Sequence, residues 1–242
     1  MAKKVYVGMS GGVDSSVTAA LLIEQGYDVT GVYMKNWSQD LPGFACPWKE
    51  DYQDAKRVAV QLGIPFKMYD FEAEYRQKVV DYMVAEYQAG RTPNPDIMCN
   101  QEVKFKIFLE TALEDGADMI ATGHYSRVID NELHVAANID KDQSYFLYRV
   151  TADALAHSLM PIGEYTSKAE VREEAAGDVH GEDPLVPVVQ GHGGFLLAQA
   201  AHAAEVGVQE AVPGVPAHPH GVLHGELIRH GAVKVIKIGR SG

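Results

Sequence analysis

The fold of this chain is decided by Val5-Tyr6-Val7-Gly8-Met9-Ser10-Gly11-Gly12-Val13-Asp14-Ser15-Ser16. The apolar run at its start predicts a strand, which turns at Gly11 and Gly12 and runs straight into a helix. Glycine permits positive φ and a close approach of the backbone to a ligand. The first N–H groups of a helix have no partner within it, and they suit phosphate oxygens. The stretch therefore predicts a phosphate-binding loop at the end of a strand.

The side chains of this loop narrow the kind of phosphate site. Ser10 and Ser15 offer hydroxyls, and the Asp14 carboxylate can cap the helix or help to hold a divalent cation. A Walker A loop needs a Lys before its Ser or Thr, and this loop has none. The order Ser-Gly-Gly-x-Asp-Ser instead resembles the pyrophosphate loop (PP-loop) of ATP pyrophosphatases, which split ATP between its α and β phosphates and adenylylate a substrate. The alternative is an ordinary strand-to-helix turn.

The composition is that of a globular protein. The chain has 242 residues, a hydrophobic content of 46% and a formal net charge of −12. The acidic balance argues against indiscriminate binding of nucleic acid, which depends on clustered Lys and Arg, but it leaves room for a local basic groove. No apolar run approaches the ~18–20 residues of a membrane span, and the first residues do not resemble a signal peptide. We therefore expect a cytoplasmic protein with no membrane partner.

The pattern along the chain predicts the architecture. Strands and helices alternate as far as His124, which predicts an α/β fold with a doubly wound, mostly parallel sheet. We expect strands at Val5–Met9, Val29–Met34, Phe66–Phe71 and Met119–His124, helices at Val13–Gln25, Asp51–Leu62, Glu72–Gln88 and Gln101–Glu114, and a hairpin at Arg127–Val135.

The chain has two cysteines, Cys46 and Cys99. They are too few for a disulfide framework, so each is either a buried apolar residue or a reactive thiol. Cys99 lies near the end of the stretch Gly90–Asn100. Two prolines in this stretch make a rigid loop before the helix expected from Gln101. Because a helix N-terminus lowers the pKa of a thiol, Cys99 is predicted to be an accessible nucleophile.

Two further motifs carry polar side chains. The strand expected at Met119–His124 ends at Gly123, on the edge where ligands of doubly wound sheets bind. The segment Asp140–Leu147 is a polar cluster that opens a short apolar helix, and on its own it also fits a capped helix start.

Together these motifs resemble, in the same order, those of the bacterial and organellar tRNA-specific 2-thiouridylases, the MnmA/TrmU family. The resemblance runs from Lys3 to about Arg172. It is carried by Gly-Met-Ser-Gly-Gly-Val-Asp-Ser-Ser at 8–16, Arg-Thr-Pro-Asn-Pro-Asp-x-x-Cys-Asn at 91–100, Lys104-Phe105-Lys106, Ala-Thr-Gly-His-Tyr at 121–125 and Lys-Asp-Gln-Ser-Tyr-Phe-Leu at 141–147. Several long motifs with independent spacing argue against a chance match.

The resemblance implies a role for each motif. It implies that Asn94, Pro95 and Asp96 contact the target uridine, and that Cys99 is the nucleophile. Lys141, Asp142 and Gln143 would contact tRNA. ATP would be bound by Gly8, Met9, Ser10, Gly11, Gly12, Val13, Asp14, Ser15, Met34 and Gly123.

The implied reaction is ATP-dependent 2-thiolation of the wobble uridine in tRNA anticodons of the Lys, Glu and Gln type. Uracil O2 is a poor leaving group, so ATP first adenylylates it; sulfur then attacks C2, and AMP departs. The sulfur would come as a persulfide from a cysteine desulfurase or a sulfur-relay protein. Because the transfer requires the negative charge on the phosphate oxygens to be neutralised, we expect Mg²⁺ beside ATP, with Asp14 as its candidate ligand.

The sequence departs from the family in two ways. Family members carry a second, persulfide-bearing cysteine downstream, whereas no cysteine follows Cys99 here, and Cys46 is a poor substitute. After Ala176 the composition also changes abruptly toward His, Gly, Val and Ala. We divide the chain into a PP-loop catalytic domain at 1–150, the start of a central tRNA-binding region at 151–176, and an atypical tail at 177–242. Our hypothesis for the tail is a frameshift near residue 176.

Two other interpretations stay open. One keeps only the PP-loop and predicts a ligase that adenylylates a carboxylate, although the Cys99 motif counts against it. The other is a catalytically impaired fragment that binds ATP and tRNA without thiolating, which the missing second cysteine favours.

Overall fold

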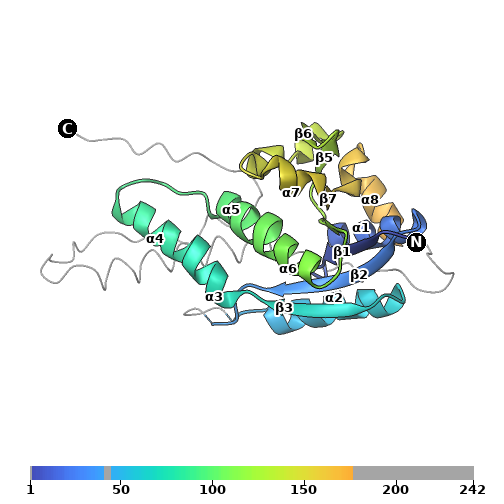
Figure 1. Ribbon diagram of the computed structural model, residues 1–242, viewed down its shortest axis with the longest axis horizontal. Helices are drawn as coiled ribbons and strands as arrows, with labels where there is room; N and C mark the ends of the chain where they lie inside the picture. The colour runs from blue at the N-terminus through green and yellow to red at the C-terminus, as the bar shows by residue number, and fades with distance from the viewer. Residues whose placement is uncertain (1, 41–44, 177–242) are drawn as a thin grey trace, which may run out of the picture.

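The computed structural model describes residues 2–40 and 45–176. Its central sheet has five strands in the order β3-β2-β1-β4-β7, all parallel, and helices cover both faces (Figure 1). The predicted doubly wound α/β fold is thereby confirmed. The strands are β1 (Lys4–Gly8), β2 (Asp28–Lys35), β3 (Phe66–Asp70), β4 (Met119–Ala121) and β7 (Ser158–Leu159).

Helical segments connect these strands. Two of them contain π-helical stretches, which join α3 to α4 and α5 to α6 without a break. The helices are α1 (Val13–Glu24), α2 (Trp48–Gln61), α3 (Glu72–Tyr75), α4 (Asp81–Gln88), α5 (Pro95–Met98), α6 (Phe108–Glu114), α7 (Ala152–Ala156) and α8 (Lys168–Ala176). The π-helical stretches are η1 (Arg76–Val80) and η2 (Cys99–Ile107), and short 3₁₀ turns are η3 (Ile139–Lys141), η4 (Ser144–Leu147) and η5 (Pro161–Glu164).

Each face of the sheet has its own hydrophobic core, because successive strand residues point to opposite sides. In β1, Val5 and Val7 pack with α1 and α2 on one face. Tyr6 packs on the other face with η2 and α6, where Phe108 is fully buried. The sheet thus stands between two helical layers, and its carboxyl edge is where loops from both layers meet.

The predicted hairpin is present as β5 (Ser126–Ile129) and β6 (Glu132–Val135). Its two turn residues, Asp130 and Asn131, have φ of 52° and 64°. Positive φ at both central positions is the geometry of a type I′ turn, which Asp and Asn tolerate better than other non-glycine residues.

The start predicted for the helix at Gln101 was wrong, and this affects the site. The helix expected from Gln101 begins at Pro95, so Cys99 lies inside a continuous helical segment and not before it. The cause is local: Asn94 caps the helix by accepting hydrogen bonds from the N–H groups of Asp96 (3.0 Å) and Ile97 (3.4 Å), and proline suits the first helical position.

Residues 151–176 join the same body. β7 pairs with β4, and Val171 and Ala175 of α8 pack against Val17 of α1. The tail predicted at 177–242, with its frameshift hypothesis, lies outside the described residues. Within the described ranges, no helix is both long and apolar enough to cross a membrane.

Candidate functional site

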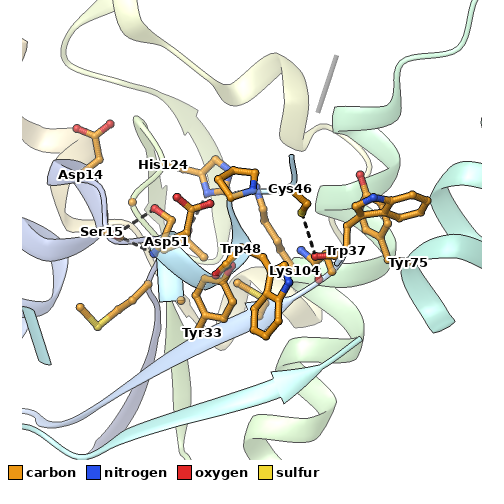
Figure 2. Close-up of a pocket in the computed structure, with 18 of the residues that line it drawn as sticks. Asp14, Ser15, Tyr33, Trp37, Cys46, Trp48, Asp51, Tyr75, Lys104 and His124 are labelled. Carbon is orange, nitrogen blue, oxygen red and sulfur yellow. Dashed lines mark hydrogen bonds between the residues drawn. The ribbon is translucent and has the colours of Figure 1, made fainter. Parts of the chain in front are cut away.

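A cavity of about 410 Å³ opens at the carboxyl ends of β1, β2 and β4 (Figure 2). From β1 the sheet extends in both directions, to β2 and β3 on one side and to β4 and β7 on the other. Doubly wound sheets bind ligands at the point where the strand order reverses in this way. Eight residues predicted for ATP or tRNA line the cavity: Gly8, Met9, Ser10, Asp14, Ser15, Met34, Gly123 and Gln143. Segments far apart in the sequence therefore meet at one place.

The glycine loop takes the predicted conformation. Gly11 has φ of 78°, and a Cβ atom there would lie 2.7 Å from the Cβ of Asp54. The loop is held by Ser15, whose hydroxyl accepts from the N–H of Ser10 (3.2 Å) and donates to the carbonyl of Gly12 (3.1 Å). The first bond within α1 runs from the N–H of Ser16 to Gly12, so the preceding amides are left without an acceptor in the helix.

Gly123 fixes the loop from the side of β4. A Cβ atom at this position would lie 2.9 Å from the carbonyl carbon of Asp14 and from the nitrogen of Ser15. Only glycine lets the end of β4 approach the start of α1 this closely.

The carboxylate of Asp14 is engaged on both oxygens. Its Oδ1 accepts from the Tyr125 hydroxyl (3.0 Å), and its Oδ2 accepts from Lys168 Nζ (3.1 Å). Burial, followed by the charge of Asp14, raises the pKa of the Tyr125 hydroxyl, which stays a neutral donor. A residue of α8 is thus tied directly to the loop.

The carboxylates that line the cavity are Asp14 and Asp51. In residues 2–40 and 45–176, no three His, Cys, Asp or Glu side chains gather as a ready metal site. Mg²⁺ beside ATP commonly takes one or two carboxylates and completes its shell with phosphate oxygens and water. The donor set therefore fits a cation carried by the nucleotide.

His124 closes the floor of the cavity next to Gly123. It is 9% exposed, its Nδ1 lies 2.8 Å from the Thr122 hydroxyl, and its ring lies against that of Phe105. Burial, assisted by the charge of Lys104, holds the pKa of His124 well below its ordinary value. The imidazole is therefore neutral at physiological pH.

The environment predicted for Cys99 was wrong. Its side chain is only 4% exposed, and burial raises the pKa of the thiol, although the charge of Lys104 opposes this. The expected lowering required a helix N-terminus at Cys99, and the helix starts earlier. Cys99 lies behind the cavity rather than in its lining, with Tyr75 close to both.

The other predicted contacts lie around this centre. Asn94 uses its side-chain oxygen to cap α5, and Pro95 and Asp96 form the first turn of that helix. Asp142 accepts from the N–H of Ala136 (2.7 Å) and from the Ser144 hydroxyl (2.6 Å), so it holds its own loop together, while Lys141 is exposed. Gln143 and Tyr125 exchange two hydrogen bonds, which bring Gln143 to the cavity.

Sequence reasoning missed much of the lining. The aromatic wall comes from Tyr33, Trp37 and Trp48, and a second thiol, Cys46, lies among them with its sulfur 3.7 Å from the carbonyl of Trp37 (Figure 2). The lining residues that were given no role in the cavity from the sequence are Tyr33, Asn36, Trp37, Cys46, Pro47, Trp48, Asp51, Tyr75, Lys104, Thr122 and His124. Residues 36–37 lie just beyond the predicted strand Val29–Met34, which was an available signal for a place at the same edge.

Comparison with known proteins agrees with this geometry. The family model described as "tRNA methyl transferase HUP domain" matches residues 3–179. A tRNA-specific 2-thiouridylase MnmA of Flavobacterium johnsoniae is 52% identical over 184 residues, which cover 72% of this chain and 46% of the relative. The MnmA of Lactococcus lactis subsp. lactis is 52% identical over 177 residues, covering 71% and 47%. The chain therefore spans about half the length of these curated relatives.

Among solved structures, a predicted subunit of tRNA methyltransferase from Methanocaldococcus jannaschii has a TM-score of 0.46 at 19% identity, over 72% of this chain and 76% of that one. The family match covers the strands, the glycine loop, the cavity and Cys99, and it confirms the resemblance found from the motifs. The chain belongs to the tRNA methyl transferase HUP-domain family, and its matched part is similar to the tRNA-specific 2-thiouridylases.

Proposed function

We propose that this chain binds ATP at the cavity and adenylylates uridine in tRNA for 2-thiolation, at the wobble position of Lys, Glu and Gln anticodons. The observation that carries the proposal is the meeting of the Ser10–Ser15 loop, Met34 and Gly123 around one cavity at the switch point of the sheet. The relatives' names support tRNA as the substrate.

In this proposal the loop amides and the hydroxyls of Ser10 and Ser15 bind the pyrophosphate part of ATP. The aromatic wall of Trp37 and Trp48 offers flat surfaces for a base. Asn36 adds an acceptor, because its buried Oδ1 has no hydrogen-bond partner within the described residues. Mg²⁺, held by phosphate oxygens with Asp14 or Asp51, would neutralise phosphate charge.

The first chemical step forms a bond between uracil O2 and the α-phosphorus of ATP. The bond from that phosphorus to the bridging oxygen breaks, and pyrophosphate leaves with the electron pair, while the N3 proton passes to solvent. The uridine must leave the anticodon stack to react, at a cost of a few kcal/mol that an unpaired loop base reduces.

The second step needs a persulfide from a sulfur-donor protein. Its terminal sulfur attacks C2, the C2–O bond breaks, and AMP leaves with the oxygen and the electron pair. The Cys99 thiolate then attacks the donor's own sulfur, which forms a mixed disulfide with Cys99 and leaves the terminal sulfur on C2. N3 regains a proton from solvent, and an external thiol reduces the disulfide.

A second candidate function stops after the first step. The burial of Cys99 and the raised pKa of its thiol favour a chain that adenylylates or binds but does not thiolate.

One assay separates these functions. The protein is incubated with ATP, Mg²⁺, unmodified tRNA and a persulfide donor, and pyrophosphate and 2-thiouridine are measured separately. We expect tRNA-dependent pyrophosphate release. Thiouridine in addition supports the full reaction, and its absence supports the second candidate. If neither pyrophosphate nor 2-thiouridine forms with tRNA and ATP present, the proposal is contradicted.

A further inference from the structure

Lys104 enters the cavity from the side of the sheet opposite to the glycine loop. The loop leads into α1, which packs on the face of Val5 and Val7, whereas Lys104 belongs to η2 on the face of Tyr6. Figure 2 shows its side chain near the centre of the residues that line the cavity. A ligand held by the loop therefore has this lysine on its far side.

Lys104 is half-buried, and its ammonium makes no hydrogen bond or ion pair with any residue in the described ranges. Two lysines that it can be compared with do have carboxylate partners: Lys106 of the same helical stretch binds Glu102 (3.3 Å), and Lys168 binds Asp14 (3.1 Å). Withdrawing a charge from water without a partner is unfavourable, so such a group indicates an anion that arrives with a ligand.

The π-helical geometry of η2 explains where this lysine lies. Hydrogen bonds in a π-helix join residues five apart, so Lys104 stands one turn above Cys99 on the same face of the helix. The positive charge acts on both neighbours: it opposes the rise that burial causes in the pKa of Cys99, and it adds to the lowering that burial causes in the pKa of His124. Lys104 thus lies between the cavity and the thiol, where bond exchange at uridine would take place.

We propose that Lys104 binds the α-phosphate of the nucleotide, the one phosphate that remains with AMP, and that it stabilises the charge that AMP gains on leaving. This inference rests on the proposed function. When the C2–O bond breaks, the electron pair stays on the oxygen that becomes part of AMP, and a fixed cation beside that phosphate favours the step. The loop amides would hold the β and γ phosphates, and Lys104 the α-phosphate.

The test compares AMP with adenosine, because the two probes differ only in the α-phosphate. Binding of each is measured by calorimetry to the wild-type chain, to Lys104→Met, which keeps an unbranched side chain without the charge, and to Lys104→Arg, which keeps the charge. Lys106→Met is the matched control, since it removes a cation from the same helix outside the cavity. ATP binding to the wild-type chain is measured in parallel.

We expect Lys104→Met to weaken AMP binding about tenfold or more with little change for adenosine, as for loss of one charge-assisted hydrogen bond. Lys104→Arg should recover much of the loss, and Lys106→Met should bind as wild type. The ratio of the two affinities is insensitive to partial misfolding, which lowers both. An unchanged ratio in Lys104→Met, with ATP binding intact, would overturn this inference alone, whereas absence of ATP binding in the wild-type chain would overturn the proposed function as well.

Discussion

At the scale of single residues, the buried His124 makes the free energy of unfolding depend on pH. Its pKa is held below the ordinary 6.5, chiefly by burial, so the unfolded chain takes up a proton first as the pH falls. The folded state therefore loses stability as the pH drops below about 6.5, by at most about 1.4 kcal/mol per pH unit from this group. Above that pH both states are neutral at this residue, and the contribution is constant.

We expect His124→Asn to flatten this dependence between about pH 7 and pH 5. The asparagine amide can still reach the Thr122 hydroxyl, and it does not titrate. The measurement is the free energy of urea unfolding at several pH values, with His134→Asn, in the β6 strand of the hairpin, as the matched control. A wild-type slope retained in His124→Asn and lost in His134→Asn would contradict the assignment.

Cys99 shows what residue-level reasoning from sequence predicts and what it does not. The sequence identified the cysteine as a candidate nucleophile. The family match is consistent with that prediction but does not test it. Its environment was predicted wrongly, because the capping role of Asn94 was overlooked and the helix therefore began too late. Burial depends on packing with η1 and α6, which local sequence does not encode.

At the scale of elements, Gly123 and Gly12 make a matched pair. A methyl group at Gly123 would meet backbone atoms of Asp14 and Ser15 at 2.9 Å, which side-chain motion does not relieve. A methyl group at Gly12 would meet only the Ser10 hydroxyl, at 3.5 Å, and Gly12 has an ordinary φ of −83°. The junction of β4 with α1 thus depends on one glycine of the two.

We expect Gly123→Ala to lower the free energy of unfolding by about 1–3 kcal/mol, the usual cost of overpacking, and to weaken ATP binding by displacing the loop. Gly12→Ala should change stability much less. Urea unfolding and calorimetry with ATP measure both effects. Equal stability of the two variants would show that the close approach at Gly123 is not a real constraint.

Most elements were predictable because their signals are local. The periodicity of strands and helices and the turn residues Asp130 and Asn131 gave the sheet, the hairpin and the loop. The π-helical stretch was not predictable, since the sequence at 99–107 shows an ordinary helical pattern. That stretch brings Lys104 above Cys99, and Lys104, although part of a motif quoted from the sequence, was given no role there.

At the scale of the whole molecule, the site is assembled from both layers of the fold. The glycine loop and α2 come from one face of the sheet. Lys104 of η2 and Tyr75 of α3 come from the other face. The α8 helix adds a tie through Lys168 to Asp14. The sequence predicted the phosphate side of this cavity because its motif is contiguous, whereas the aromatic wall becomes apparent only after the strands are aligned.

In the function proposed above, this cavity transfers AMP to uridine in tRNA. The most direct measurement uses Cys99→Ser, which blocks the second step, with ATP labelled in the α-phosphate and unmodified tRNA, and follows label that stays with the RNA after rapid quenching. We predict tRNA-bound label that is absent with ATP labelled only in the γ-phosphate. If no α-label reaches the tRNA while ATP binds normally, the cavity does not adenylylate tRNA, and the proposed function is contradicted.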